Sequence, residues 1–248
     1  LKGGIEFKDV SFTYPDTGIQ AIKNISFKVE PGQFIAIIGR TGCGKSTIAN
    51  LLMRMYDADK GDILIDNKRV EEFNLNTYRD QIGFVPQEVF LFSDTIFNNI
   101  AFGLSTVESN QVEQAAKDAA LYDNIIGFEK SFETMIGERG ITLSGGQKQR
   151  LSIARALIKE PQILIFDDCL SAIDTYTEEE ILNNLGRLMK NKTSILIAHR
   201  VSTIKNADKI LVMDGGEIIE QGTHHELMAL KKIYFELFEK QLLEEQIP

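Results

Sequence analysis

The stretch from Gly39 to Thr47 constrains the fold of this chain more than any other. It reads Gly-Arg-Thr-Gly-Cys-Gly-Lys-Ser-Thr and follows an unbroken apolar run, Phe34–Ile38. Such a run predicts a strand buried on both faces, as in a parallel sheet covered by helices. Four apolar residues then recur at helical spacing, namely Ile48, Leu51, Leu52 and Met55. The sequence therefore predicts a buried strand, a glycine-rich loop and an amphipathic helix in direct succession.

The loop fits the phosphate-binding pattern G-x-x-x-x-G-K-[ST] in the strand-to-helix context that the pattern requires. Its glycines let backbone N–H groups turn inward around a phosphate, and the following helix adds the positive end of its dipole. We expect Lys45 to neutralise the β- and γ-phosphate oxygens and the Ser46 hydroxyl to bind Mg²⁺. The predicted nucleotide-binding residues of the loop are Gly39, Arg40, Thr41, Gly42, Cys43, Gly44, Lys45, Ser46 and Thr47.

A second apolar run, Ile163–Phe166, ends in two carboxylates, Asp167 and Asp168. Alone this pattern is weak, because acidic residues after a strand also cap helices and form turns. Beside a phosphate loop, a carboxylate at the end of a neighbouring strand is what a magnesium site needs, so Asp167 is a predicted metal ligand with Ser46. The chain has no Asn-Lys-x-Asp stretch of the guanine-reading kind, which favours ATP over GTP.

The rest of the chain divides by its periodicity. Alternating apolar residues predict strands over Ile5–Tyr14, with one bulge, and over Ile25–Val29. Between about Phe92 and Leu157 the pattern is mostly helical, which indicates an inserted helical lobe. Thr223 and Glu226 have capping-box spacing ahead of a terminal helix. Further strands are predicted at Ile63–Ile65, Ile82–Val85, Ile163–Phe166, Ile195–Ala198 and Ile210–Met213, the last in a hairpin with Glu217–Glu220.

The Glu178-Glu179-Glu180 run opens a further predicted helix. Acidic residues are favoured in a first turn because they complement the helix dipole. We expect a solvated turn there and assign it no site. Apolar residues at helical spacing, predicted to face the core, follow as Ile181, Leu182, Leu185 and Leu188.

Composition excludes several classes of protein. The net charge is −9 and the basic residues are scattered, which argues against a nucleic-acid partner. No apolar run approaches the roughly 18 residues of a membrane span. Cys43 and Cys169 are isolated and form neither a metal motif nor a disulfide framework. The chain begins at Leu1 without a leader pattern, so we expect a fragment of a longer protein.

Leu143-Ser-Gly-Gly-Gln147 resembles the signature sequence of the ABC ATPase superfamily, and the resemblance covers essentially the whole chain. Tyr14 stands at the adenine-stacking position, Gln87 in the Q-loop, Asp174 in the D-loop and His199 in the switch region. The resemblance implies that Asp168, His199 and Gln87 are catalytic and that Gln87 joins Ser46 and Asp167 at the metal. Each motif alone has an ordinary structural explanation, but their occurrence together and in order favours function.

The signature implies a second phosphate site. Ser144 and the N–H groups of Gly145 and Gly146, followed by Gln147, open a predicted helix, whose N-terminus suits a phosphate. In the ABC family the phosphate loop of one cassette and the signature of a partner enclose one ATP between them. The resemblance therefore implies a head-to-tail dimer held by ATP, which opens once the γ-phosphate is removed.

Two stretches resemble the exporter branch of the family, Phe90–Ile96 and Gly137–Gly140. Ile136 stands where the family usually has valine, and Met135 where it usually has an acidic residue. The coupling contacts of this stretch with a membrane domain are therefore expected to differ in detail. The resemblance implies a membrane domain outside this chain, a place at the cytoplasmic face of the cell membrane, and export of drugs or lipids.

Asp168 departs from the family pattern, in which hydrolysing members carry Glu directly after the metal-binding aspartate, here Asp167. The shorter carboxylate is expected to orient the attacking water poorly, because a misplacement of about 1 Å lowers a rate on the order of 100-fold. In the family, Asp here accompanies pairs of unlike half-transporters with one degenerate site, so we expect a slow site and a non-identical partner cassette. An ordinary homodimer, in which Asp168 suffices, is the alternative.

The sequence thus predicts an α/β fold, a P-loop NTPase (RecA-like) core with an N-terminal antiparallel β subdomain and an inserted α-helical subdomain. Residues 1–86 and 158–248 are expected to form the core with the β subdomain, and residues 87–157 the helical subdomain with the signature. Two other functions compete: a nucleotide-gated binding module that barely turns over, and a soluble ABC ATPase of DNA repair or translation. The single cassette with a short helical insertion disfavours the latter.

Overall fold

Parallel strands form the centre of the molecule in the computed structural model, which describes residues 1–137, 141–170, 173, 175–189 and 192–245. Within these residues, six strands make a sheet in the order β10-β9-β3-β8-β7-β6. All neighbours are parallel except the β9–β10 hairpin. Their bounds are β3 Phe34–Gly39, β6 Ile82–Val85, β7 Ile163–Asp167, β8 Thr193–Ile197, β9 Lys209–Asp214 and β10 Glu217–Gly222.

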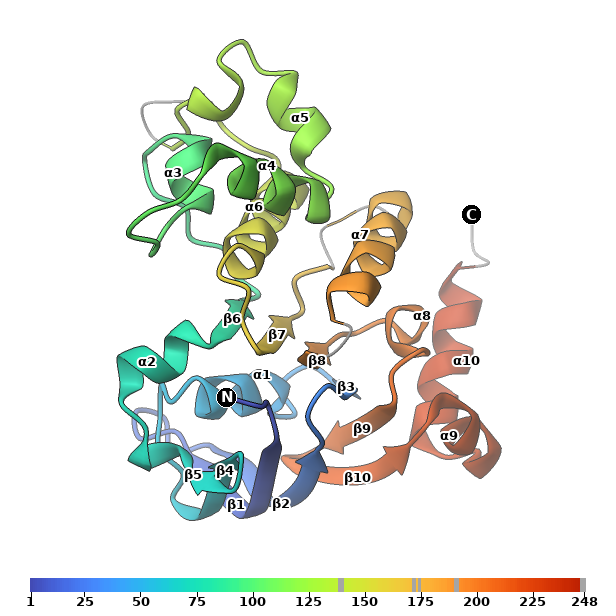
Figure 1. The fold of residues 1–248 in the computed structure, drawn as a ribbon. Coiled ribbons are helices and arrows are strands. Elements are labelled where there is room, and N and C mark those ends of the chain that lie inside the picture. Colours follow the sequence, from blue (N-terminus) through green and yellow to red (C-terminus); the bar gives the residue numbers. More distant parts are fainter. Residues whose placement is uncertain (138–140, 171–172, 174, 190–191, 246–248) are drawn as a thin grey trace.

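A second, antiparallel sheet lies beside the first in Figure 1, with the order β2-β1-β4-β5 in the described chain. The register of β1 against β2 shifts after Phe7, and Asp9 there has φ 50°. The predicted bulge is therefore confirmed, and it resets the alternation so that both Phe7 and Val10 are buried. The bounds are β1 Ile5–Thr13, β2 Gln20–Val29, β4 Lys60–Ile65 and β5 Lys68–Arg69.

Alternate residues of β3 enter two different cores, which explains why this strand is apolar throughout. Ile35 and Ile37 pack with α1 (Lys45–Leu52) and the antiparallel sheet, whereas Ala36 and Ile38 pack on the side of the helical lobe. A strand buried on both faces has no polar positions to alternate with. The predicted parallel-sheet strand is confirmed. The helix after it is shorter than expected, because α1 ends at Leu52 and leaves Met55 half exposed.

A helical lobe lies apart from the two sheets (Figure 1), as predicted. Its longest helix, α6, packs against α3, α4 and β6 and so joins the lobe to the central sheet. The limits of this subdomain at residues 87 and 157 stay a prediction. The elements are α3 Ile96–Ile100, α4 Ser109–Asp118, α5 Tyr122–Ile126, η2 Ser131–Glu133 and α6 Gly145–Leu157.

The C-terminal segment differs from the prediction of one helix. Lys231 adopts a left-handed conformation, φ 52°, and divides the segment into α9 (His224–Leu230) and α10 (Ile233–Glu245). Glu220 accepts hydrogen bonds from the amides of Ile233 and Tyr234, so it caps α10 from β10. The capping box of Thr223 and Glu226 is present as expected. Periodicity alone missed the break because apolar residues continue across it.

Glu178 contradicts the expectation of a solvated turn. It lies in the first turn of α7 (Thr175–Leu188) but is buried, and its two oxygens accept hydrogen bonds from Arg200 and Thr203. Burial of a charge is tolerated here because both oxygens are paired. The helix itself packs as predicted, with Ile181 and Leu185 fully buried. The remaining elements are η1 Val70–Glu72, α2 Leu75–Asp80 and α8 Val201–Ile204.

Candidate functional site

The glycine-rich loop wraps around the ammonium group of Lys45. Lys45 Nζ donates to the carbonyl oxygens of Gly39 (2.9 Å) and Arg40 (3.0 Å), and α1 begins directly after Gly44. Gly44 has φ 100°, and a Cβ there would lie 2.3 Å from the carbonyl oxygen of Ala21, so only glycine fits. The loop thus presents a buried cation and a helix N-terminus at one point, which is the arrangement that binds phosphate.

Two oxygen ligands meet beside this loop. Ser46 Oγ donates to Asp167 Oδ1 at 2.9 Å, which joins the start of α1 to the end of β7. Burial raises the pKa of Asp167, and the Ser46 hydrogen bond partly opposes this rise. A buried carboxylate next to a hydroxyl suits Mg²⁺, which needs only one or two protein ligands when phosphate oxygens complete its shell. Nowhere in the described chain do three or more His, Cys, Asp or Glu side chains form a metal cluster.

Asp168 connects the other two predicted catalytic residues. Its Oδ2 accepts from Gln87 Nε2 at 3.2 Å and lies 3.4 Å from His199 Nε2. Burial raises the pKa of Asp168, while His199, Lys45 and Arg200 oppose the rise. Its backbone has φ 44° and its amide donates to Ile197, so the end of β7 is tied to the end of β8. Aspartate enters this left-handed region more readily than most residues.

These groups share one cavity of about 250 Å³. Tyr14 lines it, its hydroxyl lies 3.0 Å from Thr47 Oγ1, and its ring packs edge-on against Phe12 and Tyr56. The lining residues are Tyr14, Ile19, Ala21, Thr41, Gly42, Gly44, Lys45, Ser46, Thr47, Gln87, Asp167, Asp168, Ile197 and His199. The structure thus brings the predicted base-stacking, phosphate, metal and catalytic residues together.

Some predicted residues lie elsewhere, and others were missed. Gly39, Arg40 and Cys43 belong to the loop but do not line the cavity. Ile19 and Ala21 line it and were not predicted. Ile19 is 62% exposed although it is apolar. The sequence signal that could have indicated it as a site residue was its position as an isolated apolar residue after Pro15-Asp-Thr-Gly18. Asp174 lies outside the described residues.

The signature residues occupy the N-terminus of α6 and not the cavity. Ser144 and Gln147 form a complete capping box, in which the Ser144 side chain accepts from the Gln147 amide and the Gln147 side chain accepts from the Ser144 amide. Gly145 and Gly146 follow in the first turn of the helix. Within the described residues, two separate helix N-termini therefore have the chemistry of a phosphate site, one in the sheet core and one in the helical lobe.

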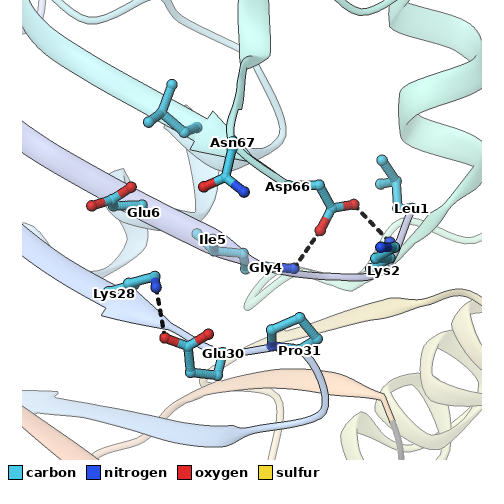
Figure 2. Close-up of a pocket in the computed structure, with 11 residues that line it drawn as sticks. Leu1, Lys2, Gly4, Ile5, Glu6, Lys28, Glu30, Pro31, Asp66 and Asn67 are labelled. Atoms are coloured by element: carbon cyan, nitrogen blue, oxygen red, sulfur yellow. Dashed lines mark hydrogen bonds and ion pairs between the residues drawn. The ribbon is translucent and has the colours of Figure 1, made fainter.

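A larger cavity, about 460 Å³, lies at the N-terminal strands but holds no such group of residues (Figure 2). Several of its charged side chains have partners within the chain. Asp66 accepts from the amides of Lys2 and Gly4, and Lys28 pairs with Glu30 at 2.7 Å. The cavity is a seam around the first residues, and its lining lacks the phosphate-loop, carboxylate and imidazole residues that gather at the smaller cavity.

A parallel sheet with a phosphate loop at the carboxyl end of β3 and an acidic residue at the end of β7 defines a P-loop nucleotide-binding protein. The family described as ABC transporter matches residues 22–171. The chain therefore belongs to the ABC transporter family, as the signature indicated.

Individual relatives agree with this assignment. The chain is 49% identical over 238 residues to an ATP-dependent lipid A-core flippase of Pseudomonas fluorescens (strain Pf0-1), covering 96% of this chain and 40% of the flippase. It is 45% identical over 240 residues to the ATP-dependent lipid A-core flippase of Escherichia coli K12, covering 96% and 41%. A solved structure titled as a bacterial Atm1-family ABC exporter with ATP bound superposes with a TM-score of 0.93 at 43% identity, covering 97% of this chain and 42% of that one.

The chain spans about two fifths of the length of these relatives. In the described part of the chain, no helix has the length and apolar character needed to span a membrane.

Proposed function

We propose that this chain is the ATP-binding and ATP-hydrolysing domain of an ABC exporter, and that it works in a head-to-tail dimer at the cytoplasmic face of a membrane. The observation that carries the proposal is the convergence of Lys45, Ser46, Asp167, Asp168 and His199 on one cavity. Those residues supply a phosphate-binding cation, a metal site and a carboxylate that faces an imidazole.

Each side chain has a distinct task in phosphoryl transfer. Lys45 binds the β- and γ-phosphate oxygens, and Tyr14 stacks on the adenine base. Asp168 accepts a hydrogen bond from the attacking water and orients it, with Gln87 and His199 fixing the position of its carboxylate. His199, which lines the same cavity, would also contact the γ-phosphate. Positioning and charge stabilisation account for most catalysis of this kind, because the protein takes no covalent part.

Ser46 and Asp167 would hold Mg²⁺, with Gln87 as a further oxygen ligand. When bound, the ion neutralises negative charge on the phosphate oxygens. The hydrogen bond between Ser46 and Asp167 supports this role, because it already brings two hard oxygen ligands together.

The separate signature helix supports a dimer. The phosphate loop and the Ser144 end of α6 are both suited to phosphate, yet only the former lines the cavity of this chain. A second cassette in the opposite orientation supplies its own Ser144, Gly145, Gly146 and Gln147 to complete the site. ATP is then the contact between the two cassettes, and its hydrolysis releases them.

A membrane domain is the second partner. A groove of about 320 Å³ lies between the segment after the Q-loop and the segment before the signature, and its walls include Val89, Leu91, Ile141 and Leu143. This groove, whose lining also includes Thr142 and Lys148, would receive a helix of the membrane domain. Relatives named as lipid flippases favour a lipid-like amphiphile as the transported molecule, which the membrane domain selects.

We further propose that the site of this chain is slow, because Asp168 stands one methylene shorter than the usual glutamate. In that case the signature of this chain completes the competent site of a non-identical cassette. The homodimer, in which the Asp168 carboxylate reaches the water unaided, is the competing proposal. The hydrogen bond that Asp168 accepts from Gln87 and its contact with His199 support a working role for this carboxylate in either case.

The deciding experiment measures the ATPase rate of the purified chain against its concentration, alone and mixed with a glutamate-bearing cassette from the same source. Low activity alone with strong stimulation in the mixture supports the asymmetric pair. Robust activity alone, rising with the square of concentration, supports the homodimer.

Lys45→Ala is the matched negative control, and Lys60→Ala, at an exposed position of β4, the matched neutral one. Loss of ATP binding in the first variant only is the expected result. A chain that binds no ATP under any condition would refute the proposed function altogether.

A further inference from the structure

The backbone around His199 is held by a residue of the C-terminal helix. Gln241, on α10, donates from Nε2 to the carbonyl oxygen of His199 and accepts at Oε1 from the amide of Val201 at 2.7 Å. A single primary amide therefore bridges the two residues on either side of Arg200. We propose that Gln241 is a positioning residue for His199, and that α10 thereby sets the rate of the proposed hydrolysis.

The switch segment needs such a support because it leaves the sheet. Strand β8 ends at Ile197, and the amide of Ala198 still donates to Ile37 of β3. Helix α8 begins at Val201, and Arg200 at its N-cap makes no side-chain cap. An arginine has no acceptor to offer, whereas a free amide N–H in a first turn needs one. Gln241 supplies that acceptor from another helix.

Arg200, between His199 and Val201, is held by a different helix, α7. Arg200 Nη1 lies 2.8 Å from Glu178 Oε2 on α7, and Thr203 Oγ1 of α8 donates to Glu178 Oε1 at 2.6 Å. The turn from His199 to Val201 is thus held on two sides. The Arg200 side chain binds Glu178 of α7, and the backbone of His199 and Val201 binds Gln241 of α10. A side chain has only a few rotamers on a given backbone. Because the backbone of His199 is fixed, only a few rotamers of its side chain place Nε2 at 3.4 Å from Asp168 Oδ2.

Helix α10 does not depend on Gln241 for its own attachment. Glu220 caps its first turn, Tyr234 is fully buried, and the Tyr234 hydroxyl lies 2.8 Å from His224 Nδ1. The helix is therefore anchored two turns before Gln241. Replacing Gln241 should release the switch segment while the helix stays in place.

The inference rests on the proposed function of His199, so the test separates the two. We would measure kcat and KM for ATP in the chain and in Gln241→Ala, with Glu239→Ala, at an exposed position of the same helix, as the control. Gln241→Ala should lower kcat by roughly 3- to 30-fold, because small displacements of a catalytic group are costly. KM should change less than about twofold, since Gln241 does not line the nucleotide cavity.

A double-mutant cycle shows whether Gln241 acts through His199. In the His199→Ala background, the Gln241→Ala substitution should cause no further loss of kcat. An equal loss in both backgrounds, or unchanged kcat in Gln241→Ala, would overturn the inference. If instead His199→Ala hydrolyses ATP at the wild-type rate, the assigned role of His199 is what fails.

Imidazole NMR gives a readout that does not need activity. The chain has three histidines, so a histidine-labelled sample gives three ring signals, of which His199→Ala identifies one. Gln241→Ala should shift or broaden the His199 signal and leave the His224 signal unchanged. His224 reports on the attachment of α10, because its ring contacts Tyr234 and Phe238 of that helix. Gln241→Glu should also shift the His199 signal, because a carboxylate still accepts from Val201 but donates nothing to His199. An unmoved His199 signal in both variants would refute the positioning role.

Discussion

His199 Nε2 lies 3.4 Å from Asp168 Oδ2, the same oxygen that accepts a hydrogen bond from the side-chain amide of Gln87 at 3.2 Å. The carboxylate is therefore held between two catalytic candidates from different strand ends. Its reach toward a water molecule is set by the length of its own side chain.

Asp168→Glu should raise kcat for ATP about tenfold or more, because the longer side chain brings the carboxylate close to in-line geometry. Steady-state hydrolysis by the chain alone checks this, with Asp168→Asn as the inactive reference. Unchanged turnover in Asp168→Glu would show that side-chain length does not limit the reaction, and would favour the homodimer.

Asp168→Asn should stabilise the nucleotide-free fold although it stops hydrolysis. Burial raises the folded pKa of Asp168 above its ordinary value of 3.8, so ionised Asp168 at neutral pH costs folding free energy. That cost is present once the pH exceeds the raised folded pKa and fades as the pH falls through that pKa toward 3.8. The Tm of Asp168→Asn should therefore exceed that of the wild type at pH 7 to 8, and the difference should shrink as the pH falls toward 3.8. Thermal denaturation across this range measures it, and a lower Tm at every pH would contradict the prediction.

Tyr14→Ala should weaken ATP binding by about 1–3 kcal/mol, the usual contribution of base stacking on an aromatic ring. Tyr14→Phe keeps the ring and loses only the contact between its hydroxyl and Thr47, so its Kd should stay within about threefold of the wild type. Titration calorimetry gives both constants, and Tyr122→Ala in the helical lobe is a remote control. Equal damage in the two Tyr14 variants would assign the effect to the hydroxyl instead of the ring.

Arg155→Ala should destabilise the fold by about 2–4 kcal/mol. The Arg155 guanidinium donates to the carbonyl oxygens of Asn99 and Phe90 and to the Asn99 side chain, all within 2.9 Å. It also lies over the rings of Phe92 and Phe102. A lysine ammonium cannot reproduce the several fixed N–H donors of the planar guanidinium. Arg155→Lys should therefore recover only part of the lost folding stability.

Urea denaturation measures the free energy of unfolding of both Arg155 variants. Lys148→Ala, at an exposed position of the same helix, should fall within about 0.5 kcal/mol of the wild type. An equal loss in Lys148→Ala would mean that α6 is sensitive to substitution in general.

The sequence by itself determined the central strand, the phosphate loop after it and the family. The reason is that these features are local: a run buried on both faces must be apolar throughout, and the phosphate-binding pattern is complete within one continuous stretch, Gly39–Thr47. Asp167 could be assigned as a metal ligand because a carboxylate at the end of a strand beside a phosphate loop suits a magnesium site. Asp168 and Gln87 were assigned through the resemblance to the ABC ATPase superfamily.

Only the tertiary structure decided how residues far apart in the chain pair. Glu178 looks like a solvated first-turn residue until Arg200 and Thr203 are brought against it, and no periodicity distinguishes Gln241 from any other polar position of a C-terminal helix. The break at Lys231 was likewise hidden, because one left-handed residue leaves the apolar pattern intact. Hydrogen bonds between distant segments depend on where the backbone goes, and that is fixed by packing of the whole core.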